Sequence, residues 1–162
     1  MGSDDGFSLI LNGHVDVVPA GDRSQWDYDP FGGEITDKRI LGRGASDMKA
    51  GVAGLLFAMK VLKDSGADLK GNIRLHIVSD EESGSEYGTT WLCEQGYAEG
   101  ANAAIIAEPT TNWTIESGQK GNLHIVFKSI GKSAHGSLGN YKGDNAILKL
   151  NKVLANIEML TK

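Results

Sequence analysis

The sequence has a single cysteine, no cluster of basic residues and no long apolar run. One cysteine, Cys93, excludes an internal disulfide framework and suits a reducing compartment, so we expect a cytoplasmic protein. A net charge of −5 without a Lys/Arg cluster argues against nucleic acid as a partner. No apolar run approaches the roughly 20 residues that span a bilayer, and the opening letters MGSDDG contain no signal-peptide core. We therefore expect neither a nucleic-acid-binding nor a membrane protein.

Apolar residues and glycine, in contrast, are plentiful. The 162 residues, 40 % of them hydrophobic, can form one ordinary domain, or one domain and part of another. The 22 glycines cluster beside acidic residues and histidines. Such clustering is typical of turns around a functional site and not of low-complexity sequence.

The first two thirds of the chain alternate between strand and helix patterns. This alternation predicts an α/β fold with a largely parallel sheet and covering helices. Residues 32–44 predict a hairpin with a glycine-rich exit, and Ser46 is the expected N-cap of the first helix. The predicted buried strands are residues 7–13, 72–79 and 102–108, and the predicted helices are about 47–63 and 85–96.

The pattern of apolar and polar residues changes after Pro109. Residues 113–118 and 122–131 predict antiparallel strands, and a helix is expected from about Asp144. Two strands and one helix are too little to bury both faces of a sheet. We therefore predict a partial α/β domain over residues 1–117 and the beginning of an α+β domain over residues 118–162.

Side chains suited to binding a metal follow each of the three predicted parallel strands. In open α/β sheets, ligands bind beyond the carboxyl ends of the strands, so these side chains are expected to meet. Several carboxylates around one histidine cannot be buried unpaired, and a divalent cation would neutralise them. The residues are His14 and Asp16 after the first strand, Asp80, Glu81 and Glu82 after the second, Glu108 after the third, and Asp47 in the turn into the first helix.

Each of these motifs, taken alone, has a simpler interpretation. A His-x-Asp pair is more often a surface hydrogen bond, an aspartate in a first helical turn is usually a cap, and adjacent glutamates usually form a solvated face. Only their joint position at strand ends favours a metal site. His76 and His124 lie in strand patterns and are interpreted as structural, and Cys93 is expected on the core side of its helix. His135 lies in a small polar loop, where a functional and a structural role remain equally open.

Six motifs in this order resemble the co-catalytic zinc hydrolases that include acetylornithine deacetylase, succinyl-diaminopimelate desuccinylase, aminoacylase and glutamate carboxypeptidase. The similarity extends from about Leu9 to the end of the chain. It implies a zinc-peptidase-like catalytic domain over residues 1–117 and the start of a lid and dimerisation domain over residues 118–162. The motifs are GHVDVVPAG, WDYDPFGG, GRGASDMKAG, DEESGS, AEPT and GKSAHGS.

The resemblance also implies two divalent metals, zinc or alternatively cobalt or manganese. His14 and Glu108 would bind one metal, Glu82 would bind the other, and Asp47 would bridge them. A bridging carboxylate holds two cations roughly 3.5–4 Å apart against their repulsion.

Three further residues take roles by the same resemblance. Asp16 would orient His14 through a hydrogen bond. Glu81 would be the general base that takes a proton from the attacking water and passes it to the leaving amine. His135 would reach the active site of a partner subunit in a homodimer formed through the lid, and would stabilise the oxyanion there.

The family's second metal needs one more histidine from beyond the lid, and the chain ends at Lys162. We therefore expect this chain to be part of a longer enzyme, with one tight metal site at His14, Asp47 and Glu108, and negligible turnover by itself. The expected function of the longer enzyme is amide hydrolysis of N-acylated amino acids or small peptides. Two alternatives remain open, a catalytically silent module and an aminopeptidase or dipeptidase.

Overall fold

The computed structural model describes residues 1–3, 5–110, 114–121, 123–138 and 142–160. The chain divides into two compact units, Met1–Glu116 and Ser117–Lys162. Each unit is described by itself. The division lies beside the predicted boundary, and the assignment of the second unit to a lid domain stays a prediction.

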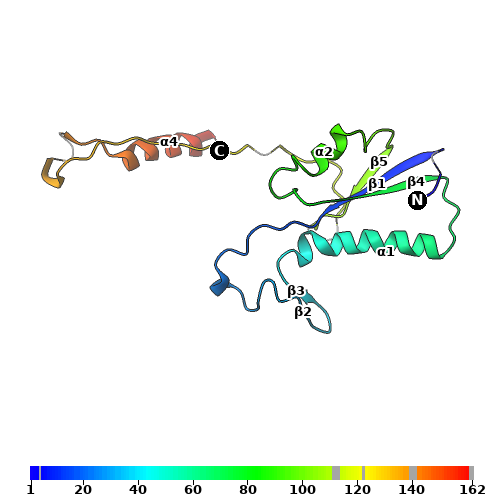
Figure 1. The fold of residues 1–162 in the computed structure, drawn as a ribbon. Coiled ribbons are helices and arrows are strands. Elements are labelled where there is room, and N and C mark those ends of the chain that lie inside the picture. The colour runs from blue at the N-terminus through cyan, green and yellow to red at the C-terminus, as the bar shows by residue number, and fades with distance from the viewer. Residues whose placement is uncertain (4, 111–113, 122, 139–141, 161–162) are drawn as a thin grey trace. The chain divides into compact units, whose positions relative to one another are not determined.

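The first unit is built on a three-stranded parallel sheet (Figure 1). Its strands are β1 (Phe7–His14), β4 (Gly71–Val78) and β5 (Ala103–Ile106). The order is β4-β1-β5, and β1 pairs with β4 from Phe7 opposite Gly71 to His14 opposite Val78. The parallel sheet with helices confirms the predicted α/β class. Because all three strands run in one direction, their carboxyl ends meet at one edge of the sheet.

Two helices accompany the sheet in this unit. Helix α1 (Ala50–Asp64) runs along one face, and helix α2 (Thr89–Glu94) lies on the opposite side (Figure 1). Gly51 lets α1 approach β5 closely, because a Cβ there would overlap the carbonyl oxygen of Ala107. The buried apolar side chains come mainly from β1 and the start of α1, and they are Ile10, Leu11, Met48, Val52, Leu55 and Val78.

The first helix begins later than predicted. Ala45–Lys49 forms an irregular turn in which Asp47 (φ −108°, ψ 104°) and Met48 (φ −125°, ψ 29°) depart from helical geometry. Met48 is completely buried beside Gly13, and the backbone that places its side chain there is not helical. Lys49, not Ser46, precedes the first turn of α1, and it makes no side-chain capping bond. The N-cap prediction for Ser46 is therefore wrong.

Two burial predictions in the same unit are also wrong. All four residues of β5 are exposed, because in the described residues β5 pairs only with β1 and is an edge strand. Cys93 is exposed on a helix that is shorter than predicted. The hairpin is confirmed, with β2 (Glu34–Ile35) antiparallel to β3 (Ile40–Leu41).

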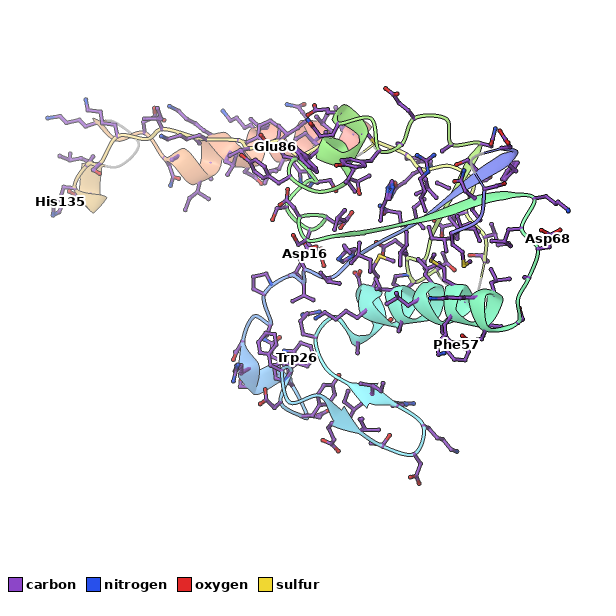
Figure 2. The ribbon with its side chains drawn as sticks, turned by 45° about the vertical axis from the view of Figure 1, so that its right-hand side comes forward. Asp16, Trp26, Phe57, Asp68, Glu86 and His135 are labelled. Carbon is purple, nitrogen blue, oxygen red and sulfur yellow. The ribbon has the colours of Figure 1, made fainter. Side chains whose placement is uncertain are left out.

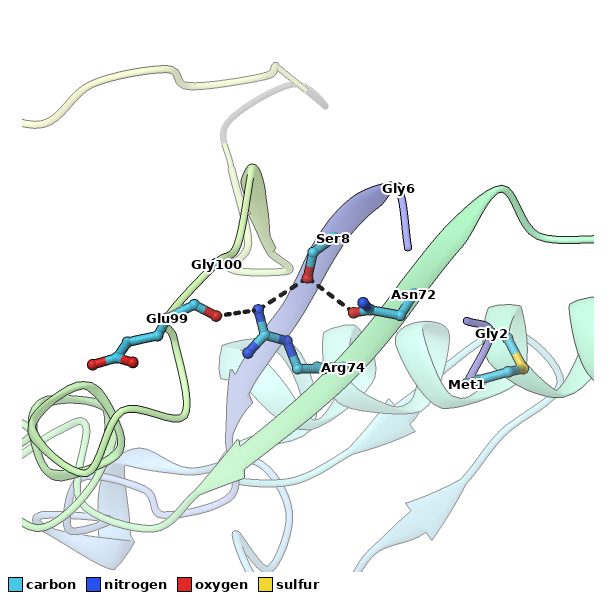
Figure 3. Close-up of a pocket in the computed structure, with 8 residues that line it drawn as sticks. All are labelled: Met1, Gly2, Gly6, Ser8, Asn72, Arg74, Glu99 and Gly100. Atoms are coloured by element: carbon cyan, nitrogen blue, oxygen red, sulfur yellow. Dashed lines mark hydrogen bonds between the residues drawn. The ribbon is translucent and has the colours of Figure 1, made fainter. Parts of the chain in front are cut away.

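Arg74 connects β4 to the turn that follows α2. Its guanidinium donates to the carbonyl oxygen of Tyr97 at 2.7 Å. It also donates to the carbonyl oxygen of Glu99 (3.0 Å) and to Ser8 Oγ (2.9 Å) (Figure 3). Ser8 Oγ in turn donates to Asn72 Oδ1 at 2.9 Å. Ser8, Asn72, Arg74 and Glu99 line a hollow of about 340 Å³ at the amino ends of β1 and β4, the end of the sheet opposite to His14.

The second unit contains helix α4 (Ala146–Leu160), in agreement with the helix expected from about Asp144, and a short 3-10 turn at Gly136–Leu138. The described residues of 114–131 form no strand, so the predicted antiparallel pair is wrong for this part of the chain. A strand needs a hydrogen-bonded partner. Ile115 is 97 % exposed and Val126 92 % exposed, which shows that their apolar side chains are not packed. His124 is likewise exposed and outside any strand.

Candidate metal centre

The candidate metal ligands converge at the carboxyl ends of the parallel strands, as predicted. His14 is the last residue of β1 and is only 1 % exposed. Glu81 and Glu82 follow β4, and Glu108 follows β5. Asp47 reaches the same place from the irregular turn before α1.

The imidazole of His14 is the common point of the cluster. Its Nε2 lies 3.1 Å from Asp47 Oδ1, 3.2 Å from Glu108 Oε1 and 3.9 Å from Glu81 Oε2. The three carboxylates come from segments that are far apart in sequence. The strand order β4-β1-β5 brings them together because it places His14 between the ends of the other two strands.

The second ring nitrogen fixes the tautomer. Nδ1 lies 3.0 Å from the backbone carbonyl oxygen of Asp16, which can only accept a hydrogen bond, so Nδ1 carries the proton. In the neutral imidazole, Nε2 is then an acceptor that faces acceptor-only carboxylates. This arrangement is stable only if Nε2 binds a proton or a cation.

Asp16 links the two sides of the cluster. Its Oδ1 lies 3.5 Å from His14 Nδ1 and is buried without a hydrogen bond, whereas Oδ2 accepts from the backbone N–H of Glu82 at 3.0 Å. The side chain of Glu82 turns back to accept from the backbone N–H of Val18 at 3.3 Å. Asp16 lies beside the loop that carries these glutamates (Figure 2).

Charge crowding shifts two pKa values in the cluster. Burial by itself lowers the pKa of His14, but the Asp16 carbonyl and the carboxylates of Glu108, Asp16 and Asp47 outweigh burial, so the pKa lies above its ordinary 6.5. Burial also raises the pKa of Glu108 above its ordinary 4.5, and the neighbouring charges of Asp47 and Glu81 raise it further against the opposing effect of His14. Both shifts go in the direction that favours proton uptake, so a bound cation would compete with protons in this cluster.

The donor set fits a divalent metal ion. Two groups of ligand atoms each lie within 4.8 Å of one another, His14 with Asp47 and Glu82, and His14 with Glu81 and Glu108. Ligands bound to one ion at about 2.0–2.2 Å lie up to roughly 4.4 Å apart, so the 3.1 Å and 3.2 Å separations around Nε2 are compatible with a shared ion. Imidazole and carboxylate ligands are shared by several divalent first-row metals.

The structure brings together six of the seven predicted site residues. They are His14, Asp16, Asp47, Glu81, Glu82 and Glu108. Their division into ligands, bridge and base stays a prediction, and the geometry groups Glu81 with Glu108 as closely as it groups Glu82 with Asp47. His135 lies in the second unit, is exposed, and contacts Ser137 Oγ through Nδ1 at 2.9 Å.

Asp80, which the sequence pattern placed among the side chains suited to binding a metal, belongs to neither group of candidate ligands in the structure. Asp80 was grouped with the adjacent glutamates, but its carboxylate accepts from the backbone N–H of Tyr87 at 2.8 Å. Ser83 and Gly84, which follow the two glutamates, are a turn signal, and a turn there places Asp80 at the start of a loop that folds back on it. His76, interpreted as structural, lies half-buried on β4, where burial and then the charge of Arg74 lower its pKa.

Comparison with known sequences identifies a family. The profile of peptidase family M20/M25/M40 matches residues 10–153, which include all seven predicted site residues. A probable succinyl-diaminopimelate desuccinylase of Staphylococcus epidermidis is 40 % identical over 141 residues, covering 86 % of this chain and 34 % of the relative. The succinyl-diaminopimelate desuccinylase of Rhodospirillum centenum is 36 % identical over 159 residues, covering 93 % of this chain and 40 % of the relative.

A solved structure agrees with this match. The crystal structure of human carnosine dipeptidase 1 superposes with a TM-score of 0.56 at 32 % identity, over 65 % of this chain and 23 % of the human chain. The chain thus spans between about a third and two fifths of the desuccinylases that it matches. In the described part of the chain, the helices are all too short or too polar to cross a membrane.

Proposed function

The chain belongs to peptidase family M20/M25/M40, a family of metal-dependent hydrolases, and we propose that it carries the metal site of an enzyme that hydrolyses N-acylated amino acids or small peptides. The observation that supports this proposal most strongly is the geometry of His14. A buried imidazole whose acceptor nitrogen faces Asp47 and Glu108 at 3.1 Å and 3.2 Å needs a positive charge at that nitrogen, and a divalent cation would supply it and also neutralise the surrounding carboxylates.

The proposed chemistry needs no covalent intermediate. A bound divalent ion lowers the pKa of water from about 15.7 toward about 7 and polarises an amide carbonyl. Within the chain, His14, Asp47, Glu82 and Glu108 would hold the ions, and Asp16 would keep the His14 ring in place. Glu81, whose carboxylate is 48 % exposed at the edge of the cluster, is open enough to accept a proton from water and deliver it to the leaving amine.

Two substrate classes follow from the relatives. The desuccinylases at 40 % and 36 % identity favour an N-succinyl amino acid, and other N-acyl amino acids share the same scissile amide. The dipeptidase neighbour at 32 % identity favours a dipeptide as the second candidate. The higher identity places the N-acyl amino acid first. A homodimer formed through the second unit, with His135 acting in the partner's site, remains part of the proposal.

The test uses both the chain and a longer hybrid. Isothermal titration of the metal-free chain with zinc tests the site directly, and one tight ion per chain is expected. For turnover, residues 10–153 would replace the matching segment of the Staphylococcus epidermidis relative. The hybrid is expected to hydrolyse N-succinyl amino acids faster than N-acetyl amino acids or dipeptides, and to lose this activity when chelated.

A matched pair of variants tests the role of the base. Glu81→Gln in the hybrid should retain metal and lose turnover, whereas Glu86→Gln, an exposed glutamate of the same loop, should retain both. Equal metal loss in Glu81→Gln and Glu82→Gln would show that the two glutamates share one role. Absence of zinc binding by the native chain would overturn the proposed function itself, and turnover that survives complete chelation would exclude a metal-dependent mechanism.

A further inference from the structure

The loop that follows β4 carries Glu81 and Glu82, and its first residue, Asp80, accepts two hydrogen bonds from across the loop. The backbone carbonyl of Asp80 accepts from the N–H of Ser85 at 2.7 Å, and its carboxylate Oδ2 accepts from the N–H of Tyr87 at 2.8 Å. Asp80 is therefore hydrogen-bonded, through its backbone and its side chain, to two residues on the returning part of the loop, Ser85 and Tyr87. The two glutamates are the first residues inside the closed loop.

The closure holds a backbone conformation that would otherwise be unfavourable. Ser85 has φ +64°, and among the described residues it is the one non-glycine residue with positive φ. A left-handed conformation is unfavourable for a non-glycine residue because its Cβ approaches the following carbonyl oxygen. The bonds from Ser85 N–H to Asp80 and from Gly88 N–H to the Ser85 carbonyl (3.2 Å) hold Ser85 on both sides. Without the Asp80 bonds, we expect this turn to relax and the glutamates to move with it.

The loop is anchored to the rest of the site at a second point. Glu82 N–H donates to Asp16 Oδ2 at 3.0 Å, which connects the loop to the residues that follow β1. Gly88 packs closely on β4, because a Cβ there would lie 3.3 Å from Val78 Cβ and 3.6 Å from Asp80 Cβ. Glu81 and Glu82 are thus held between an anchor at Asp16 and the closure at Asp80.

We propose that Asp80 is a positioning residue of the metal centre: its carboxylate holds the Tyr87 amide and thereby directs Glu81 and Glu82 toward His14. The proposal depends on the proposed function, since it requires a metal site. Asp80 itself belongs to neither group of candidate ligands, and its Oδ2 is already bonded to Tyr87. It therefore acts through its neighbours and does not bind the metal.

The experiment compares Asp80→Ala with Asp80→Asn in the full chain, with zinc affinity measured by titration calorimetry and the cobalt site followed by its visible absorption spectrum. Alanine removes both the charge and the acceptor, whereas asparagine removes the charge and keeps an oxygen that can accept from Tyr87 N–H. We expect Asp80→Ala to weaken zinc binding about 10–100-fold, as loss of a residue that supports metal ligands does, and to alter the cobalt spectrum. Asp80→Asn should restore both readouts to near the native values.

Asp22→Ala is the matched control. The Asp22 carboxylate also accepts from a backbone N–H, that of Ser24 at 2.9 Å, and it lies in an exposed loop that supplies no candidate ligand. Its removal changes the net charge by the same amount as Asp80→Ala. We expect its zinc affinity and cobalt spectrum to match those of the native chain. A loss of zinc affinity in Asp22→Ala would show that removing any one negative charge weakens binding.

The outcomes separate the two proposals. Failure of the native chain to bind zinc would overturn the proposed function, whereas native zinc binding with an unchanged Asp80→Ala would overturn only the role of Asp80. Equal losses in Asp80→Ala and Asp80→Asn would also overturn it, because charge alone would explain them. If Asp80→Ala does not fold, hydrogen exchange of the Tyr87 amide is measured in Asp80→Asn. A protected amide together with native-like zinc binding supports the role of Asp80. An unprotected amide together with native-like zinc binding excludes it.

Discussion

The two units of the chain contain similar apolar patterns and reach different structures. In Met1–Glu116, apolar runs pair as parallel strands and bury residues such as Ile10 and Leu11 to 6 % exposure. In Ser117–Lys162, the run from Leu123 to Ile130 forms no strand in the described residues, and Leu123 is 83 % exposed. Helix α4 nevertheless forms as predicted.

The difference shows which elements depend on partners. A helix satisfies its backbone hydrogen bonds within its own segment, whereas a strand satisfies them only against another strand. The site follows the same division. His14 is buried because its strand lies between two others, whereas His135, in a loop of the second unit, is exposed and bonded to Ser137 nearby. Four predictions test this contrast, beginning with the largest expected effect.

Replacing His14 and His135 one at a time should show that the zinc affinity depends on the first unit and not on the second. His14→Ala removes the nitrogen that both candidate ligand groups share, so we expect zinc affinity to fall by at least about 100-fold. His135→Ala should leave the zinc affinity of the chain unchanged. Titration calorimetry measures both. A comparable loss in His135→Ala would place a metal ligand in the second unit and contradict the assignment.

Two glycines of α1 test the packing of the first unit. A Cβ at Gly51 would overlap the Ala107 carbonyl, so Gly51→Ala should lower the free energy of unfolding by about 1–3 kcal/mol through overpacking. A Cβ at Gly54 meets nothing within 4 Å, so Gly54→Ala should raise stability by about 1 kcal/mol through helix propensity. Urea unfolding measures both, and equal shifts in the two variants would contradict the close approach of α1 to β5.

Capping should distinguish α4 from α1. Asn145 Oδ1 accepts from the N–H groups of Ile147 (2.9 Å) and Leu148 (3.2 Å), so Asn145→Ala should destabilise α4 by about 1 kcal/mol and reduce helical circular dichroism. Ser46 makes no capping bond to α1, and Ser46→Ala should leave the spectrum unchanged. Loss of helix in the Ser46 variant and not in the Asn145 variant would reverse this conclusion.

The smallest expected effect is a pH dependence confined to the first unit. The pKa of His14 is raised in the folded chain, so protonated His14 contributes stability that is fully present below its ordinary pKa of 6.5 and is lost as pH rises through the higher folded pKa. The metal-free chain should therefore become less stable as pH rises above about 6.5, and His14→Ala should remove this slope. Zinc should abolish it as well, since neutral His14 would then hold the metal. A flat profile for the native chain would show that the carboxylates do not raise this pKa.

Much of the first unit follows from local pattern. Apolar runs predicted β1, β4 and β5 to within a few residues, and the position of acidic residues after each run predicted the cluster. The start of α1 was missed because Met48 is buried beside Gly13, a contact between segments 35 residues apart in number that no local pattern contains. The exposure of β5 was missed because apolar composition does not reveal whether a strand is central or at an edge.

The candidate site divides in the same way. Residue type and chain position were sufficient to name His14, Asp47, Glu81, Glu82 and Glu108, because ligand chemistry belongs to the side chains themselves. That Nε2 of His14 is the shared point depends on the strand order β4-β1-β5, and the role of Asp80 depends on a hydrogen bond to Tyr87 across a turn. Neither is encoded by spacing alone, because distances between side chains in a fold are set by how strands pair and loops close.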